Sequence, residues 1–262
     1  QCCARRVVSC FPAKPAWTPN CFHSIQKGKT ISVPKTLKKN IRALCNLQWK
    51  KVTINKGNKK YKVKSGCLIS KSGKTFYGNL EKKKSIKIPN GVKTIAEGAL
   101  FLNDNLKVVY IPKTVSKIKE KAFGTSKSLR IKIASKNQYY YISKGCVVSR
   151  RSGRLVVAGI KKGVITIPEK VTVLKEGTSF VGGKCEKIVF PKSLKQIEAY
   201  WAGTLGNSSK IEYIFQSKIP PKRKGAAYLP SDGSVVYVPK GTKQVYEKAL
   251  KKFAFNLKIV EK

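Results

Sequence analysis

The stretch SIKIPNGVKTIAEGALF, residues 85–101, contains the repeating unit from which most of this chain is built. Similar sequences recur downstream as VYIPKTVSKIKEKAFG, ITIPEKVTVLKEGTSF and IVFPKSLKQIEAYWAG. Each copy begins with a short β-branched run in which apolar and other side chains alternate, and a proline ends that run. Alternation with a period of two predicts a strand, and proline cannot donate to its hydrogen-bonded ladder. Each copy therefore predicts one short strand followed by a turn.

The spacing of the prolines reveals a nested repeat. The interval from Pro89 to Pro112 is the same as that from Pro168 to Pro191, and Pro89 and Pro168 hold equivalent places in two larger repeats. The larger repeat also contains a duplicated segment, because NKKYKVKSGCLISKSGK at residues 58–74 matches NQYYYISKGCVVSRRSGR at residues 137–154. A repeat of about 23 residues therefore runs inside a larger repeat of about 79 residues, and such fixed periods are typical of stacked repeat architectures.

The apolar positions of one unit predict how the units assemble. A first set alternates along each strand and is expected to point inward: Ile86, Ile88, Val109, Ile111, Ile165, Ile167, Ile188 and Phe190. A second set follows the turn and includes Val92, Ile95 and Phe101. A single unit cannot bury both sets, whereas stacked units form a continuous core. The pattern predicts a strand-rich solenoid with one short strand in each coil of about 23 residues.

The motif IPxxVxxIxxxAF, clearest at residues 88–101 and 111–123, resembles the bacterial BspA-type leucine-rich repeat. The duplicated segments and the tail at residues 219–253 are also similar to parts of such arrays. The resemblance implies an α/β, strand-rich leucine-rich-repeat solenoid over residues 31–262, with a closing unit at about 219–262. It further implies a surface protein that acts in adhesion or in recognition of host or matrix components.

Both ends are expected to be capped, because terminal coils otherwise expose their core. Residues 1–30 hold four closely spaced cysteines and form the predicted N-terminal cap: Cys2, Cys3, Cys10 and Cys21. Disulfides in an oxidising compartment are favoured over a metal site, since the segment has no C-x-x-C pair and His23 is its one histidine. Sequence does not choose among the three possible pairings. The chain begins at Gln1 without methionine, which we interpret as a mature or trimmed form.

The remaining predicted structural roles concern the core and the C-terminal cap. Cys67 and Cys146 occupy matching positions in the duplicated segments and are expected to fill the core as small apolar side chains. Near the C-terminus, Val245, Ala249 and Phe253 recur at helical spacing behind a candidate N-cap at Thr242. This pattern predicts an amphipathic helix that covers the last coil.

The charge of the chain is far from balanced. Lysine and arginine total 56 against 12 acidic residues, which gives a formal net charge of +44. Charge of this density creates a field that recruits polyanions, although lysines also solvate the surface of many folds. No apolar run is long enough to predict a membrane span.

Catalytic patterns are scarce. A nucleophilic triad would have to use His23, the single histidine of the chain. Glu97, Glu120 and Glu176 occupy one repeated position, so we expect them to stack and pair with lysines such as Lys121 rather than form an acid–base pair. No P-loop or dinucleotide-binding motif is present. We therefore expect a protein that is not an enzyme and needs no cofactor or metal.

Strand residues that alternate with the core set are expected on the open face of the sheet. They include the candidate ligand-binding residues Lys87, Lys107 at a strand edge, Tyr110, Arg130, Lys132 and Lys187. Basic groups interleaved with tyrosine suit phosphate, sulfate or carboxylate groups, although a merely solvated face is the alternative. Other basic runs, such as 82–84 and 161–162, are predicted to lie in loops.

The leading hypothesis is a secreted or cell-surface binding protein that engages anionic glycans, cell-wall polymers or acidic faces of host or matrix proteins. A nucleic-acid-binding protein is the second hypothesis, disfavoured by the predicted disulfides and by the excess of lysine over arginine, because base readout favours arginine. A hydrolase lacks a supporting constellation. A purely structural spacer within a longer surface protein remains a further alternative.

Overall fold

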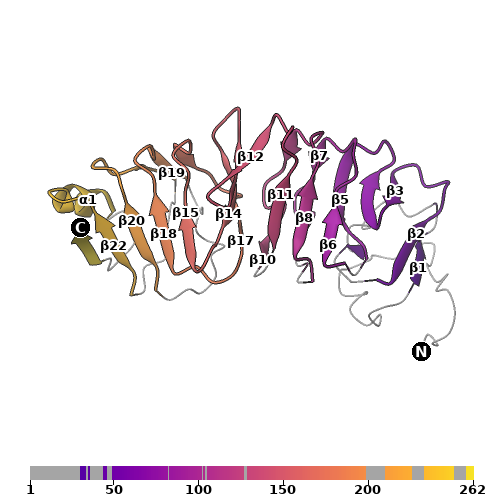
Figure 1. Cartoon of the computed structure of the whole chain (residues 1–262), viewed down its shortest axis with the longest axis horizontal. Helices are drawn as coiled ribbons and strands as arrows, with labels where there is room; N and C mark the ends of the chain where they lie inside the picture. The colour runs from indigo at the N-terminus through magenta and orange to yellow at the C-terminus, as the bar shows by residue number, and fades with distance from the viewer. Residues whose placement is uncertain are drawn as a thin grey trace.

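The computed structural model describes residues 30–33, 35, 44–45, 49–81, 83–101, 103, 105–126, 129–198, 210–225, 233–250 and 258–262. The chain winds into an elongated, strand-rich solenoid whose strands lie side by side along its long axis (Figure 1). The predicted cysteine cap, including Cys2, Cys3, Cys10 and Cys21, lies outside the described residues. In the described part of the chain, no helix is long and apolar enough to cross a membrane.

The strands that begin the coils form the first set, many of them followed by a proline, and all of their pairings are parallel. They fall into three sheets: β1 (Thr30–Val33) with β2 (Lys51–Ile54); then β6 (Ser85–Lys87), β8 (Val108–Ile111) and β11 (Arg130–Ile133); then β15 (Val164–Thr166), β18 (Lys187–Phe190), β20 (Glu212–Phe215), β22 (Val235–Val238) and β23 (Lys258–Glu261). Parallel pairing follows from the repeat, because each coil returns the chain to the same place one strand spacing along the axis.

A second set of shorter strands follows the turns. The pair β7 (Thr94–Ile95) and β9 (Lys117–Ile118) comes from the first large repeat, and β16 (Val173–Leu174), β19 (Gln196–Glu198) and β21 (Lys222–Lys224) come from the second. Buried residues of the two sets, such as Ile86 and Ile95, belong to the same apolar cluster. The core therefore lies between the two sets of strands.

Each duplicated segment folds into three antiparallel strands, called a hairpin below after its first two strands. The two hairpins extend the second set of strands. The first hairpin comprises β3 (Tyr61–Lys64), β4 (Cys67–Ser70) and β5 (Thr75–Asn79), and the second comprises β12 (Tyr140–Ser143), β13 (Cys146–Ser149) and β14 (Leu155–Gly159). The tight turn Ser65–Gly66 has φ values of 52° and 75°, and Lys144–Gly145 has 50° and 79°. Two successive positive φ values are typical of the two-residue turns that match the twist of a hairpin. The last strand of each hairpin pairs in parallel with a strand of a later coil. In the first hairpin β5 pairs with β7, and in the second β14 pairs with β17 (Ser179–Val181). Strand β17 also pairs with β10 (Thr125–Ser126).

Burial confirms the predicted inward positions. The first apolar set is at most 3% exposed, and Val92, Ile95, Cys67 and Cys146 are fully buried. The prediction for Phe101 is wrong, because its side chain is 45% exposed while the preceding Leu100 is buried. The Phe101 ring instead covers Gly124 of the next coil, at a place where a Cβ atom would collide with the ring.

The C-terminal helix is present, but its buried face differs from the predicted one. Helix α1 (Lys243–Leu250) begins directly after Thr242, whose carbonyl oxygen accepts a hydrogen bond from the N–H of Tyr246. Tyr246 and Leu250 are buried, whereas Val245 is 53% exposed, so the prediction for Val245 is wrong. The shift by one residue turns the aromatic ring of Tyr246 toward Phe215, with ring centroids 5.2 Å apart. The predicted contribution of Phe253 lies outside the described residues.

Candidate functional site

Three predicted site residues form one row across the sheet of β6, β8 and β11. Lys87 is in register with Tyr110, and Tyr110 is in register with Lys132. The row points away from the core, because its neighbours along the strands, Ile86 and Val109, are buried. The alternation seen in the sequence therefore brings these three side chains together on the open face.

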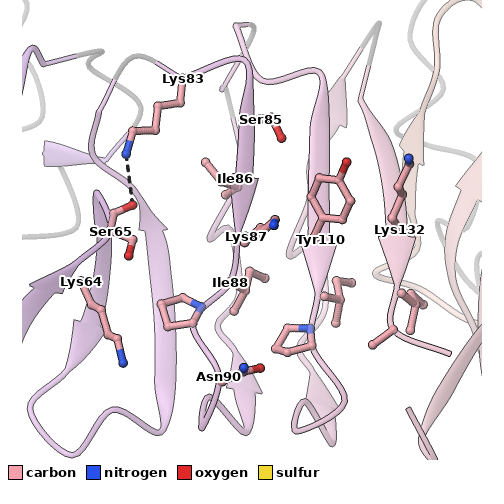
Figure 2. Close-up of a pocket in the computed structure, with 15 residues that line it drawn as sticks. Lys64, Ser65, Lys83, Ser85, Ile86, Lys87, Ile88, Asn90, Tyr110 and Lys132 are labelled. Carbon is pink, nitrogen blue, oxygen red and sulfur yellow. Dashed lines mark hydrogen bonds between the residues drawn. The ribbon is translucent and has the colours of Figure 1, made fainter. Parts of the chain in front are cut away.

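The side chains of the row contact one another. The ammonium nitrogen of Lys87 lies 5.9 Å from the centre of the Tyr110 ring, and that of Lys132 lies 5.3 Å from it. Because β6 and β11 flank β8, the two cations approach the ring from neighbouring strands on opposite sides (Figure 2). Cation–π attraction at exposed sites is about 0.5–1 kcal/mol, enough to bias the positions of two flexible lysine side chains.

The row lies in a groove of about 740 Å³ on the open face of the solenoid. Lys64 and Ser65 of the first hairpin turn, together with Lys83, line one end of this groove (Figure 2). Lys83 is held there by the Glu81 carboxylate at 2.9 Å and donates a hydrogen bond to the Ser65 carbonyl oxygen at 3.3 Å. No acidic residue is among the described residues that line the groove. The groove therefore presents four lysines, at positions 64, 83, 87 and 132, around one tyrosine.

Lys107 and Arg130 lie beside this row rather than in it. Lys107 precedes β8 and Arg130 begins β11, and both side chains are exposed. The backbone N–H of Arg130 donates to the carbonyl oxygen of Lys107 at 2.8 Å. Arg130 and Lys132 share the outward side of β11, because side chains at alternate positions of a strand point the same way.

Lys187 occupies a different sheet and a different electrostatic environment. Its ammonium group forms an ion pair of 2.8 Å with Glu212 on the neighbouring strand β20. The hydrogen bond and charge of Glu212 raise the pKa of Lys187 above its usual value. Lys187 is thus outward-facing, as predicted, but the structure does not bring it to the Lys87–Tyr110–Lys132 row.

The second large repeat supplies an internal comparison. The positions that correspond to Lys87, Tyr110 and Lys132 hold Thr166, Val189 and Ile214, which are also in register across three strands. The coil architecture is the same in both places. Consequently the fold does not require the cationic row, and the row adds a chemical property to the scaffold.

Loop lysines complete the site, and the sequence reasoning missed them. Lys83 belongs to the basic run 82–84, for which the sequence predicts only a loop, yet it lines the groove. One signal in the sequence could have indicated this role. Lys83 follows the first duplicated segment, and Lys162 follows the second at the equivalent position. The hairpins, which interrupt the array, determine where these loops meet the sheet.

Two of the three repeated glutamates form ion pairs with basic side chains, one with the expected Lys121 and one with an arginine. Glu176 lies 3.6 Å from the Lys121 ammonium group, and Glu120 lies 3.1 Å from the Arg154 guanidinium group. Within the described residues, no cluster of three or more histidine, cysteine or acidic side chains could hold a metal ion.

Cys67, Cys146 and Cys185 are buried free thiols. Burial raises the pKa of Cys67 to about 12 and those of Cys146 and Cys185 to about 11. Since the thiolate is the reactive species, these groups are poor nucleophiles at neutral pH.

The chain matches no protein-family model and no curated protein. Two solved structures are similar in fold. A leucine-rich repeat protein from Eubacterium ventriosum shares 14% identity with a TM-score of 0.46, over 89% of this chain and 73% of that one. The pneumococcal vaccine antigen PcpA shares 12% identity with a TM-score of 0.39, over 90% of this chain and 80% of that one.

Proposed function

We propose that this protein is a non-enzymatic binding protein, secreted or displayed at a cell surface, that engages anionic polymers through the groove around Tyr110. The observation that carries the proposal is the register of Lys87, Tyr110 and Lys132, which places two cations against one ring on adjacent strands. The repeats resemble the BspA type, and this resemblance suggests a role in adhesion or in recognition of host and matrix components.

Electrostatics supports an anionic ligand at this place. The lysines of the groove belong to a chain of net charge +44, so the groove lies in a field that is positive overall, offset at Lys83 by the nearby Glu81 carboxylate. An anion that enters the groove relieves this repulsion and releases counterions, which makes binding favourable and salt-dependent.

Binding to immobilised heparin, a sulfated glycan, tests the proposal. We expect the wild-type protein to elute well above about 0.2 M salt, where non-specific ionic contacts have weakened strongly. The double variant Lys87→Thr/Lys132→Ile should elute earlier, and it should retain its circular dichroism spectrum because the second large repeat carries Thr166 and Ile214 at these positions.

A matched control separates the groove from bulk charge. Lys93 and Lys117 are exposed lysines of the same coils, located at the second set of strands. Lys93→Thr/Lys117→Thr removes the same two charges and should leave elution closer to that of the wild type. Equal shifts for the two double variants, or wild-type elution at or below about 0.2 M salt, would contradict the proposal.

A further inference from the structure

A second groove adjoins the first and shares a residue with it. It has a volume of about 570 Å³ and is lined by residues that include Arg130, Lys132, Ile142, Lys161 and Lys162. Lys132 lines both grooves, so the two meet at β11. As in the first groove, no acidic residue is among the described lining residues. Together they place an excess of positive charge between the first hairpin and the second, in which Lys83 at one end is paired with Glu81 behind it at 2.9 Å.

The two ends of this surface are related by the large repeat. Lys83 follows the first hairpin, and Lys162 follows the second hairpin at the equivalent position. The hairpin turns themselves also contribute residues, Ser65 to the first groove and Gly145 to the second. The three-stranded sheet of β6, β8 and β11 therefore has a basic loop at each border.

Beyond Lys162 the chemistry changes. A third groove of about 460 Å³ also includes Lys162, but Glu186 and Glu212 line it as well. Lys187 in this groove is already paired with Glu212 at 2.8 Å. The first two grooves thus have no glutamate or aspartate among their described lining residues, and this acid-free surface ends where the third groove begins.

The cations of this surface are arranged across the strands, and this arrangement limits the shape of the ligand. Its cations come from successive coils rather than from one strand, and adjacent strands lie about 4.8 Å apart. The backbones of Lys87 and Lys132 are two strands apart, so their separation is about 10 Å. A small anion contacts one part of this surface, whereas a linear polymer that crosses the strands contacts all of it.

The chemistry of the row favours a polysaccharide over a nucleic acid. Single-stranded nucleic acids bind by stacking bases on aromatic rings. Tyr110 is the one aromatic residue among the described residues that line the two grooves, and two ammonium groups already lie against its ring. Arg130 is the one arginine among the described lining residues, and the lysines act as point charges that lack the planar fork arginine offers to base edges. The surface therefore offers charge without a free platform for stacking.

We infer that the two grooves form one continuous track for a linear, densely sulfated polysaccharide, which crosses the strands from Lys83 to Lys162. This inference rests on the proposed function. It specifies the class of ligand, the direction in which the ligand crosses the strands and the residue at which the binding site ends. Dense sulfation supplies repeated full charges, whereas a polysaccharide with one carboxylate per disaccharide leaves most of the cations of the track without an anion.

Affinity for heparin fragments of defined length tests the track. We expect the affinity at 0.15 M salt to rise roughly tenfold or more from a tetrasaccharide to a decasaccharide, because only the longer fragment contacts Lys83 and Lys162 at the two ends of the track at once. Hyaluronan, which carries one carboxylate per disaccharide, should bind far more weakly than heparin of the same length. Equal affinity for short and long heparin fragments would overturn the track while leaving the proposed function intact.

Two pairs of substitutions locate the far end. Lys161→Ala/Lys162→Asn should weaken the decasaccharide roughly tenfold and leave the tetrasaccharide unchanged. Asparagine suits position 162 because Lys162 has a φ of 49°, which asparagine tolerates well. The control Lys192→Ala/Lys195→Ala removes two exposed lysines that line neither groove and should change neither affinity.

Three outcomes separate the explanations. Loss of decasaccharide affinity in the Lys161/Lys162 variant but not in the Lys192/Lys195 variant supports the track. Heparin binding without sensitivity to Lys161 and Lys162 overturns the track alone, and failure of heparin to bind at any length overturns the proposed function as well. Binding of oligothymidylate as tight as that of heparin, with the same sensitivity to substitution, overturns the choice of a polysaccharide.

Discussion

The phenolic oxygen of Tyr140, on the second hairpin, lies 2.9 Å from the backbone nitrogen of Ile118 in the preceding coil. The oxygen accepts this hydrogen bond and donates one to the carbonyl oxygen of Ser116 at 3.5 Å. Tyr140 is 7% exposed, and burial is the main cause that raises its pKa. The hairpin is thus attached to the solenoid by a side chain that satisfies a buried backbone N–H.

Replacement of Tyr140 by phenylalanine should lower the free energy of unfolding by about 1–3 kcal/mol, because the buried N–H of Ile118 loses its acceptor. Urea denaturation followed by circular dichroism measures the change. Tyr139→Phe is the matched control, since Tyr139 is 45% exposed, and it should change stability by less than about 0.5 kcal/mol. Equal effects of the two substitutions would contradict a role for the Tyr140 hydroxyl.

Asn137 joins the same hairpin to the coil before it. Its side-chain oxygen accepts hydrogen bonds from the N–H groups of Tyr139 and Tyr140, both at 2.8 Å. Its side-chain nitrogen donates to the carbonyl oxygens of Pro112 and Val115, at 3.0 and 3.2 Å. The residue is 2% exposed, and its bonds to Val115 and Tyr140 are buried while those to Pro112 and Tyr139 are partly buried.

Asn137→Ala should therefore destabilise the protein by about 2–4 kcal/mol, because several buried backbone groups lose their partners at once. The midpoint of urea denaturation reports the loss. Substitution of the adjacent exposed Gln138 by alanine is the control and should be close to neutral. A change of less than about 1 kcal/mol in Asn137→Ala would show that water replaces the side chain.

The raised pKa values of the buried thiols predict slow alkylation. In the native protein at pH 8, Cys67, Cys146 and Cys185 should react with iodoacetamide at least about 100-fold more slowly than in 6 M guanidinium chloride. Peptide mass spectrometry assigns the label to each position. Ser135→Cys places a thiol at an exposed turn and should be labelled rapidly in the same sample. Rapid native labelling of Cys146 would show that its hairpin opens readily.

The strand positions and their inward alternation were predictable because they follow from a repeat of the sequence. Ile86, Val109 and Ile188 recur at the same place in each coil, and burial of a repeated apolar position needs no knowledge of neighbouring side chains. The same spacing predicted that Lys87 and Tyr110 share the open face. The register between the strands then follows from the length of one coil.

The structural features that the sequence did not predict depend on contacts between residues at different positions of the repeat. Phe101 packs over Gly124 instead of entering the core, and that choice depends on a glycine of the next coil. Lys187 is paired by Glu212, which lies outside the regular spacing of the repeat. The helix buries Tyr246 rather than Val245 because the Tyr246 hydroxyl donates to the carbonyl oxygen of Ser217 at 2.7 Å. Such pairings follow from three-dimensional proximity, which the repeat pattern does not encode.

Glu261 of the last strand caps the C-terminal helix, and this contact predicts a pH dependence. Its carboxylate accepts a hydrogen bond of 2.7 Å from the N–H of Lys243, and bonds to backbone N–H groups there lower the pKa of Glu261. Because the folded-state pKa lies below the unfolded value of about 4.5, the stabilisation is present above pH 4.5 and is lost as the pH falls through the folded-state pKa.

Glu261→Gln should therefore lower the melting temperature by a few degrees at pH 7, and the difference from the wild type should shrink as the pH approaches 2. Differential scanning calorimetry across this range measures both effects. Glu247→Gln is the control on the same helix, since Glu247 lies 4.0 Å from Lys243 in a largely exposed pair and should matter little. A difference between Glu261→Gln and wild type that is independent of pH would contradict the carboxylate cap.

The excess of positive charge predicts that salt stabilises this fold while it weakens the proposed binding. With a net charge of +44, repulsion among lysines opposes the compact state. Raising sodium chloride from 0.01 to 1 M shortens the Debye length from about 30 to about 3 Å, so most of this repulsion is screened. The ion pairs of the described residues, such as Lys184–Glu186, are mostly exposed and lose little when screened. The melting temperature should rise by several degrees over a range in which heparin affinity falls steeply, and a falling melting temperature would show that attractive pairs outweigh repulsion.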